Sequence, residues 1–123
     1  MRILIVEDEW LIAEDYAYWL RQAGHAILGP VPSVSSAISL VKEKGCDAVL
    51  LDVQLKEEKS YMLADLLVEN AIPFAFLTGY DSGELPGRFA GVSALQKPVT
   101  REGLINAVTT LAGAARSATA HRH

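Results

Sequence analysis

Short apolar runs alternate along the chain with longer stretches in which apolar residues recur every three or four positions. Short runs bounded by polar residues are typical of buried strands, and the longer stretches are typical of amphipathic helices. The predicted strands are residues 3–6, 26–28, 48–51, 74–77 and 92–96. The helical stripes between and after them include Tyr16 and Leu20, Ala37 and Val41, Leu63 and Leu67, and Leu104 and Val108.

Local signals set the ends of several elements. The segment Gly29-Pro30-Val31-Pro32 is expected to end the second strand after Leu28, and either Ser33 or Ser35 is expected to cap the helix that follows. Residues 81–89 are rich in glycine and proline, so the fourth helical segment is expected to be short.

Five strands alternating with five helical segments indicate one α/β domain. Parallel strands need crossover connections, so this order predicts a doubly wound parallel five-stranded sheet with helices on both faces. The domain is expected to span residues 1–115, followed by a small, polar and flexible tail over 116–123. In such sheets a ligand binds outside the carboxyl ends of the strands.

Polar residues follow four of the predicted strands at that edge. Glu7 and Asp8 follow the first strand and Asp52 the third, while Thr78 and Lys97 follow the fourth and fifth. If the strand order is 2-1-3-4-5, the first and third strands are neighbours and the three carboxylates converge. Two unit charges about 4 Å apart repel by about 4 kcal/mol at an effective dielectric constant near 20. Such a cluster therefore needs raised pKa values or a cation.

Mg²⁺ suits a cluster that offers oxygen ligands alone, with no cysteine or histidine nearby. Lys97 adds a mobile positive charge and Thr78 a hydroxyl donor, so the set forms a phosphoryl-transfer site in which Asp52 can be the nucleophile. Taken singly, each residue is explained as well by a helix first turn, a turn or a surface loop. Their common position at one sheet edge is what indicates a site.

Composition narrows the setting of this site. The chain has 123 residues and a net charge of −4, which argues against a nucleic-acid or acidic-membrane partner, since both need a dense positive face. No apolar run approaches the ~18 residues of a membrane span, and the N-terminus has no signal-peptide pattern. The single cysteine, Cys46, cannot form an internal disulfide. These features predict a cytoplasmic domain in a reducing compartment.

Four motifs in order, ILIVEDE, VLLDVQL, FLTGY and LQKPV, resemble those of receiver domains of bacterial two-component response regulators, over about residues 2–115. The resemblance implies a flavodoxin-like (βα)₅ fold with strand order 2-1-3-4-5. It implies that Asp52 is the phosphoacceptor, that Thr78 hydrogen-bonds the phosphoryl group, that Lys97 forms an ion pair with it, and that the Lys97–Pro98 peptide bond is cis. The implied Mg²⁺ ligands are Glu7, Asp8, Asp52 and the backbone carbonyl of Gln54.

The resemblance also implies a function. The chain would be a single-domain response regulator that accepts a phosphoryl group from a histidine kinase or phosphotransfer protein. It would signal through phosphorylation-dependent protein contacts or onward phosphotransfer, as a monomer or weak dimer. It would be no enzyme beyond self-phosphorylation and autodephosphorylation. PFAFLTGYD and the Lys-Ser-Tyr at 59–61 further resemble a subgroup of stand-alone receivers named for a Phe-Ala-Thr-Gly-Tyr-like motif, and the chain's end soon after the last helix favours that role.

Three departures from the family pattern matter. One is the weak fourth helix, rich in glycine and proline, which suits either an order–disorder response on phosphorylation or passive disorder. Ala94 stands where receivers usually carry a switching aromatic residue, so Tyr80 or Phe89 would have to replace it if the domain switches. Lys56 stands where many receivers have proline, so the charged run 56–59 is expected to be a loose, solvated loop. The expected partner surface is residues 81–115.

Three alternatives stay open. A small phosphatase with an aspartate nucleophile would need a second aspartate at the position of Gln54. A flavodoxin-like cofactor binder would need a phosphate-binding loop after the first strand, where Glu-Asp-Glu at 7–9 would repel phosphate. A receiver-like module that binds partners without phosphorylation is compatible with Ala94.

Overall fold

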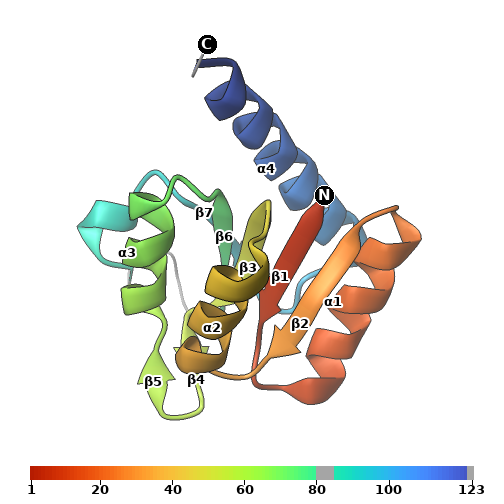
Figure 1. The fold of residues 1–123 in the computed structure, drawn as a ribbon. Helices are drawn as coiled ribbons and strands as arrows, with labels where there is room; N and C mark the ends of the chain where they lie inside the picture. The colour runs from red at the N-terminus through yellow and green to blue at the C-terminus, as the bar shows by residue number, and fades with distance from the viewer. Residues whose placement is uncertain (80–84, 122–123) are drawn as a thin grey trace.

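The computed structural model describes residues 1–79 and 85–121 of the chain, and its side chains as far as residue 113. One five-stranded parallel sheet has the order β2-β1-β3-β6-β7 (Figure 1). Its strands are β1 (Arg2–Val6), β2 (Ala26–Val31), β3 (Ala48–Asp52), β6 (Phe74–Thr78) and β7 (Ser93–Gln96). Since β6 and β7 are the fourth and fifth strands of this sheet, the predicted order 2-1-3-4-5 and the flavodoxin-like class are confirmed.

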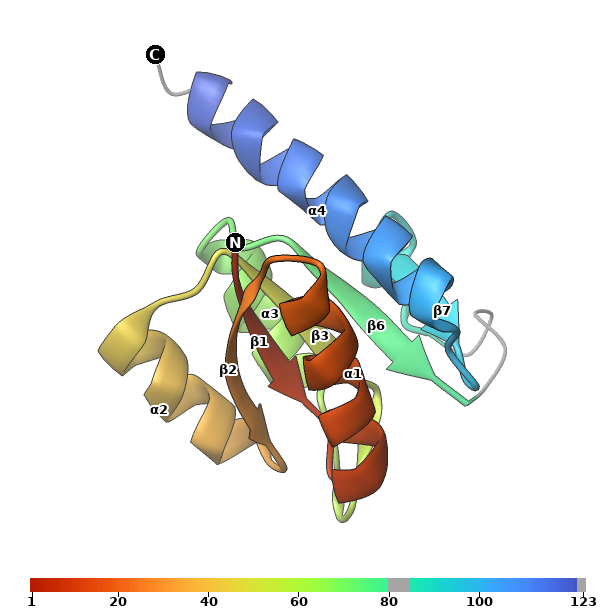
Figure 2. The same ribbon diagram turned by 90° about the vertical axis from the view of Figure 1, so that its right-hand side faces the viewer.

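Helices cover both faces of the sheet, as its parallel connections require. The helix α1 (Trp10–Gln22) and the helix α4 (Arg101–His121) lie on one face. The helix α2 (Val34–Lys44) and the helix α3 (Tyr61–Glu69) lie on the other, so that the molecule has three layers (Figure 2). Ser33 is the cap of α2, because its hydroxyl accepts a hydrogen bond from the backbone N–H of Ser36 at 3.2 Å.

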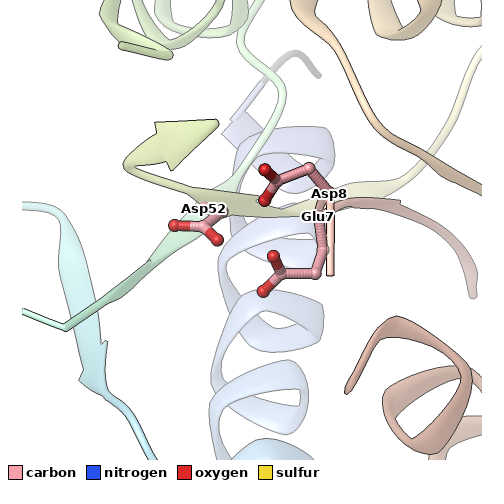
Figure 3. A group of neighbouring side chains, drawn as sticks. All are labelled: Glu7, Asp8 and Asp52. Atoms are coloured by element: carbon pink, nitrogen blue, oxygen red, sulfur yellow. The ribbon is translucent and has the colours of Figure 1, made fainter. Parts of the chain in front are cut away.

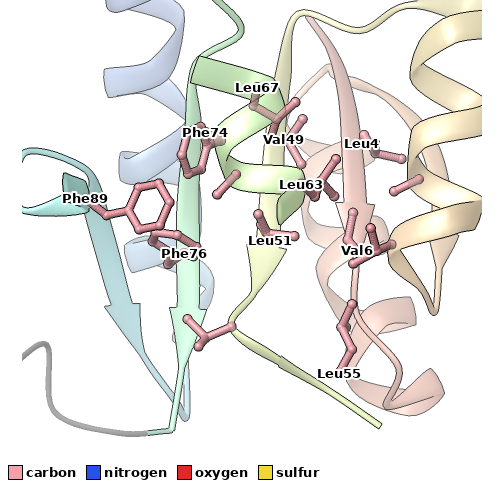
Figure 4. Close-up of a cluster of buried hydrophobic side chains, with 14 residues drawn as sticks. Leu4, Val6, Val49, Leu51, Leu55, Leu63, Leu67, Phe74, Phe76 and Phe89 are labelled. Carbon is pink, nitrogen blue, oxygen red and sulfur yellow. The ribbon is translucent and has the colours of Figure 1, made fainter. Parts of the chain in front are cut away.

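Two hydrophobic clusters, one on each face, hold the layers together. Successive residues of a strand point to opposite faces, so a strand buried on both faces is apolar at every position. Leu4 and Leu51 pack with α2 and α3, whereas Ile5 and Leu50 pack with α1 and α4. The cluster under α2 and α3 is drawn in Figure 4, where Phe74, Phe76 and Phe89 lie side by side. Burying each such side chain contributes roughly 1.5–3 kcal/mol.

The strand β2 continues to Val31, so the predicted end after Leu28 was wrong. Pro30 has no N–H to donate, but β2 is an edge strand and its pairing with β1 shifts register between Leu4 and Val6, where proline is tolerated. Gly29 has φ +81°, and a Cβ there would lie 2.8 Å from the backbone N of Val31. Only glycine fits this position without strain.

The charged run after Asp52 forms a small hairpin rather than the loose loop expected. The strands β4 (Gln54–Leu55) and β5 (Glu58–Lys59) pair antiparallel. The Gln54 side-chain amide donates to the carbonyls of Leu55 at 2.7 Å and Glu58 at 3.3 Å. The Glu58 carboxylate accepts from the backbone N–H of Val34, at the start of α2, at 3.2 Å. The hairpin's charged residues are exposed, as predicted, but its backbone is fastened to the domain.

Between β6 and β7 the described residues contain one short 3₁₀-helix, η2 (Gly87–Phe89), as expected for a poor helix former. Phe89 is buried and lies 5.3 Å from the Phe76 ring, centroid to centroid. Its neighbour Arg88 forms an ion pair of 2.9 Å with Asp65 of α3, which fastens η2 to that helix. Tyr80, the other proposed substitute for an aromatic switch, lies outside the described residues.

The helix α4 continues past the predicted domain boundary at 115 and ends at His121. The backbone of residues 116–121 is therefore helical, and the flexibility of the 116–123 tail stays a prediction. None of the helices in the described part of the chain is long and apolar enough to cross a bilayer.

Candidate functional site

Three carboxylates meet where the first and third strands end. The strands β1 and β3 are parallel neighbours with Val6 opposite Leu51, so Glu7 and Asp8 emerge level with Asp52. One oxygen from each of the three carboxylates lies within 4.8 Å of the other two (Figure 3). The convergence expected from the strand order is therefore present.

The ammonium group of Lys97 lies between two of these carboxylates. Its Nζ is 2.7 Å from Glu7 Oε1 and 2.7 Å from Asp52 Oδ2. Lys97 follows the end of β7, and its backbone N–H donates to the carbonyl of Thr78 at 2.8 Å. The Lys97–Pro98 bond is cis, as the resemblance implied. Lys97 thus joins the fifth strand to the acidic cluster at the first and third.

The pKa values show how the cluster tolerates its charges. Burial raises the pKa of Glu7, and the adjacent Asp52 raises it further, while Lys97 opposes the change. Burial and the neighbouring Glu7 also raise the pKa of Asp8. Burial lowers the pKa of Lys97, but Asp52 and Glu7 outweigh it, so the pKa of this ammonium lies above its usual range. The raised pKa values expected from the sequence are present for Glu7 and Asp8, and the Lys97 ammonium adds a positive charge beside them.

A buried oxygen of Glu7 provides a test of whether a metal ion fits. Glu7 Oε2 accepts from the backbone N–H of Glu9 at 3.1 Å. The buried Oε1 contacts the Lys97 ammonium at 2.7 Å and, in the described part of the chain, has no other hydrogen-bond partner. A cluster of three carboxylates with such an oxygen suits a hard cation that takes oxygen ligands. The cluster could therefore hold a metal ion.

The Asp52 carboxylate is held at both oxygens. Oδ2 contacts Lys97, and Oδ1 accepts from the backbone N–H of Gln54 at 3.1 Å. The carbonyl of Val53 accepts from the backbone N–H of Ser60 at 3.0 Å and from its hydroxyl at 3.3 Å. The sequence analysis named Ser60 only as part of the Lys-Ser-Tyr at 59–61 and gave it no role in the site. That Gln54 supplies a backbone carbonyl to a metal ion stays a prediction.

Thr78 lies at the same edge of the sheet. It is the last residue of β6, is 4% exposed, and pairs with Gln96 of β7. Since β6 is the neighbour of β3, Thr78 stands on the side of Asp52 opposite β1. Its role toward a phosphoryl group stays a prediction.

A groove of about 450 Å³ opens beside Lys97, between α1 and the segment that follows β7. Its lining includes Tyr16, Trp19 and Pro98. Burial raises the pKa of the Tyr16 hydroxyl to about 12. The groove therefore adjoins Lys97, whose ammonium contacts two carboxylates of the cluster.

A five-stranded doubly wound sheet with three acids, a lysine and a threonine at its carboxyl edge defines a signalling receiver. The response regulator receiver domain model matches residues 3–109, and the chain belongs to this family. Receiver domains of two-component systems are signalling phosphoacceptors rather than classical enzymes, and they interact with histidine kinases or phosphotransfer proteins.

Individual relatives are similar over different shares of their length. The transcriptional regulatory protein PdtaR of Mycobacterium tuberculosis is 32% identical over 97% of this chain, which spans 60% of PdtaR. The phyllosphere-induced regulator PhyR of Methylorubrum extorquens is 35% identical over 69% of this chain and 33% of PhyR. The solution structure of SdrG from Sphingomonas melonis is 39% identical, with a TM-score of 0.79 over 90% of this chain and 95% of that one. SdrG has also been solved in a BeF₃-activated conformation, 40% identical with a TM-score of 0.78.

Proposed function

We propose that this chain is a response regulator that accepts a phosphoryl group on Asp52, with Mg²⁺ in the acidic cluster, and signals through protein contacts that depend on phosphorylation. The observation that supports it most is the position of Asp52. Asp52 is 4% exposed, and its carboxylate lies beside two further acids and contacts a lysine ammonium at 2.7 Å. An aspartate in an ordinary turn is usually exposed to solvent and is not buried beside two other carboxylates.

The proposed transfer uses groups that the structure brings together. A carboxylate oxygen of Asp52 attacks the phosphorus of a phosphohistidine, the new P–O bond forms, and the P–N bond breaks with its electrons returning to the imidazole. Mg²⁺ held by Glu7, Asp8 and Asp52 would neutralise the negative charge that gathers there. Lys97 starts on Asp52 Oδ2 and can follow the charge onto the phosphoryl oxygens.

The size of the response can be bounded. Moving an equilibrium from 1:99 to 99:1 takes about 5.5 kcal/mol of differential stabilisation. One hydroxyl bond from Thr78 and one charge-assisted bond from Lys97 supply about 3 to 4 kcal/mol together. Phosphorylation alone is therefore expected to shift the domain partway, with a binding partner completing the change. We propose that this partner binds the surface formed by η2, β7 and α4.

Mass spectrometry after treatment with acetyl phosphate and Mg²⁺ tests the acceptor. The wild type should gain one phosphoryl group and Asp52→Asn none. Asp47→Asn is the matched control, because Asp47 comes just before β3 at the opposite end of that strand, where its carboxylate accepts a hydrogen bond from the backbone N–H of Arg2 at 2.7 Å. Phosphorylation that persists in Asp52→Asn at the wild-type level would refute the assignment.

Trp10 gives a second, non-covalent readout. It is 70% exposed and lies two residues beyond Asp8, so Mg²⁺ and then beryllofluoride should each change its fluorescence. The Asp52→Ala variant should lose the beryllofluoride step, and Trp10→Phe should lose both signals. Beryllofluoride is a suitable probe because a BeF₃-activated form of the relative SdrG exists.

A further inference from the structure

One peptide group links Ser60 to Asp52. The carbonyl of the Val53–Gln54 peptide accepts two hydrogen bonds from Ser60, at 3.0 Å from the backbone N–H and 3.3 Å from the hydroxyl. The N–H of the same peptide donates to Asp52 Oδ1 at 3.1 Å. A peptide group is a rigid plane whose carbonyl and N–H point in opposite directions. Holding its carbonyl from one side therefore aims its N–H at Asp52 on the other.

Ser60 does not serve the helix at whose start it stands. It is the N-cap residue of α3, a position where a serine hydroxyl normally accepts a bond from the first turn. Its side chain makes no such bond, whereas Ser33, at the same position before α2, does. Ser60 is fully buried, so its hydroxyl needs a partner, and the partner it has is the Val53 carbonyl.

Both ends of the hairpin are fixed. Ser60 holds the residue just before β4, and the Glu58 carboxylate in β5 bonds the backbone N–H of Val34 in α2. On the other side of the peptide, Asp52 carries the Gln54 N–H on Oδ1 and the Lys97 ammonium on Oδ2. Donors on both oxygens set the rotation of the carboxylate about its Cβ–Cγ bond. One of these two donors has its direction determined by Ser60.

We propose that Ser60 is a positioning residue for the acidic site, and that it orients the Asp52 carboxylate through the Val53–Gln54 peptide. This inference rests on the proposed function and adds to it a residue that determines how well the site binds a cation and a phosphoryl mimic. Ser60 touches neither ligand. Its effect passes through one peptide plane.

The test compares ligand affinity with stability. Ser60→Ala removes the hydroxyl bond but keeps the backbone bond, so the dissociation constants for Mg²⁺ and for beryllofluoride should rise about three- to tenfold, the range that one lost buried hydrogen bond gives. The Gln54 amide signal in a ¹H–¹⁵N spectrum should move in the ligand-free protein. Ser60→Thr keeps the hydroxyl and should keep both affinities within about twofold of wild type.

A control and a second variant keep the test decisive. Asn70→Ala removes a side-chain bond of 2.8 Å to the Leu66 carbonyl at the far end of α3, so it should change stability without changing either affinity. If Ser60→Ala does not fold, Ser60→Cys replaces the hydroxyl with a weak donor of similar shape. Its dissociation constants should rise in the same way.

The failures of the two proposals can be told apart. A wild-type protein that binds neither Mg²⁺ nor beryllofluoride counts against the proposed function, and the Gln54 amide of the ligand-free variants still reports on positioning. A folded Ser60→Ala protein with a lower free energy of unfolding, but with unchanged affinities and an unchanged Gln54 signal, would show that Ser60 is merely structural and would overturn the inference.

Discussion

Replacing Lys97 with methionine removes the ammonium that lies 2.7 Å from Glu7 and from Asp52 and leaves the two carboxylates facing each other. With oxygens within 4.8 Å, their mutual repulsion is about 3.5 kcal/mol at an effective dielectric constant near 20. Glu7 can escape the repulsion by binding a proton. From an ordinary pKa of 4.5, that protonation costs about 4.1 kcal/mol at about pH 7.5 and about 2.0 kcal/mol at about pH 6.0.

The cheaper of the two costs decides the outcome at each pH. At about pH 7.5 repulsion is cheaper, so Lys97→Met should lower the free energy of unfolding by about 3.5 kcal/mol. At about pH 6.0 protonation is cheaper, and the loss should fall to about 2 kcal/mol. The sign follows from linkage: a carboxyl whose folded pKa is raised stabilises the fold at low pH and loses that stabilisation as pH rises through the folded pKa.

Urea unfolding followed by circular dichroism at both pH values measures these losses, well above the isoelectric point near 5.3. In a Glu7→Gln background the Glu7 charge no longer repels Asp52, so Lys97→Met should there cost less than it does in the wild type, and about the same at both pH values. Lys42→Met, at an exposed position of α2, is the surface control. A loss that is the same at both pH values, or unchanged by Glu7→Gln, would refute the electrostatic account.

Three further predictions concern Tyr16, Cys46 and Gly29. Burial raises the pKa of Tyr16 to about 12. The stabilisation from its neutral hydroxyl should therefore be complete below about pH 10 and be lost toward pH 12. An absorbance titration in which Tyr16→Phe removes no late-ionising tyrosine would contradict this. Burial also raises the pKa of the Cys46 thiol from 9.0 to about 11. At pH 8, iodoacetamide should therefore alkylate Cys46 about a hundredfold more slowly in the folded protein than in urea. Equal alkylation rates would disprove this prediction. Gly29→Ala should lower the free energy of unfolding by about 1 to 3 kcal/mol in a urea titration, because φ is +81° and the new Cβ would meet Val31; no loss would mean that β2 adjusts freely.

The sheet and the edge residues could be predicted because they depend on local pattern. Short apolar runs such as Val49–Leu51 are buried on both faces wherever the chain places them, and parallel connection brings all their carboxyl ends to one edge. That alone puts Glu7 and Asp52 together once β1 and β3 are neighbours. The order of the strands was the only non-local step.

Features that depend on contacts between distant residues could not be predicted in this way. Each strand of the β4–β5 hairpin has two residues, too few to show an alternating pattern. The hairpin is held in place by the bond from the Val34 N–H, at the start of α2, to the Glu58 carboxylate. Ser60 looks like an ordinary cap in the sequence, and only the packing of α3 shows its hydroxyl turned toward Val53. The extension of β2 past Pro30 depends on a register shift against β1.

The anchoring of Glu58 on α2 has a consequence for a domain with alanine at position 94. From Asp52 the chain reaches Glu58 in six residues, and Glu58 meets the outer layer of the molecule at Val34. Glu58 therefore links the acidic cluster to the start of α2 through a short stretch of backbone that does not include β7. A displacement of the backbone beside Asp52 would strain this link whether or not a ring on β7 can turn.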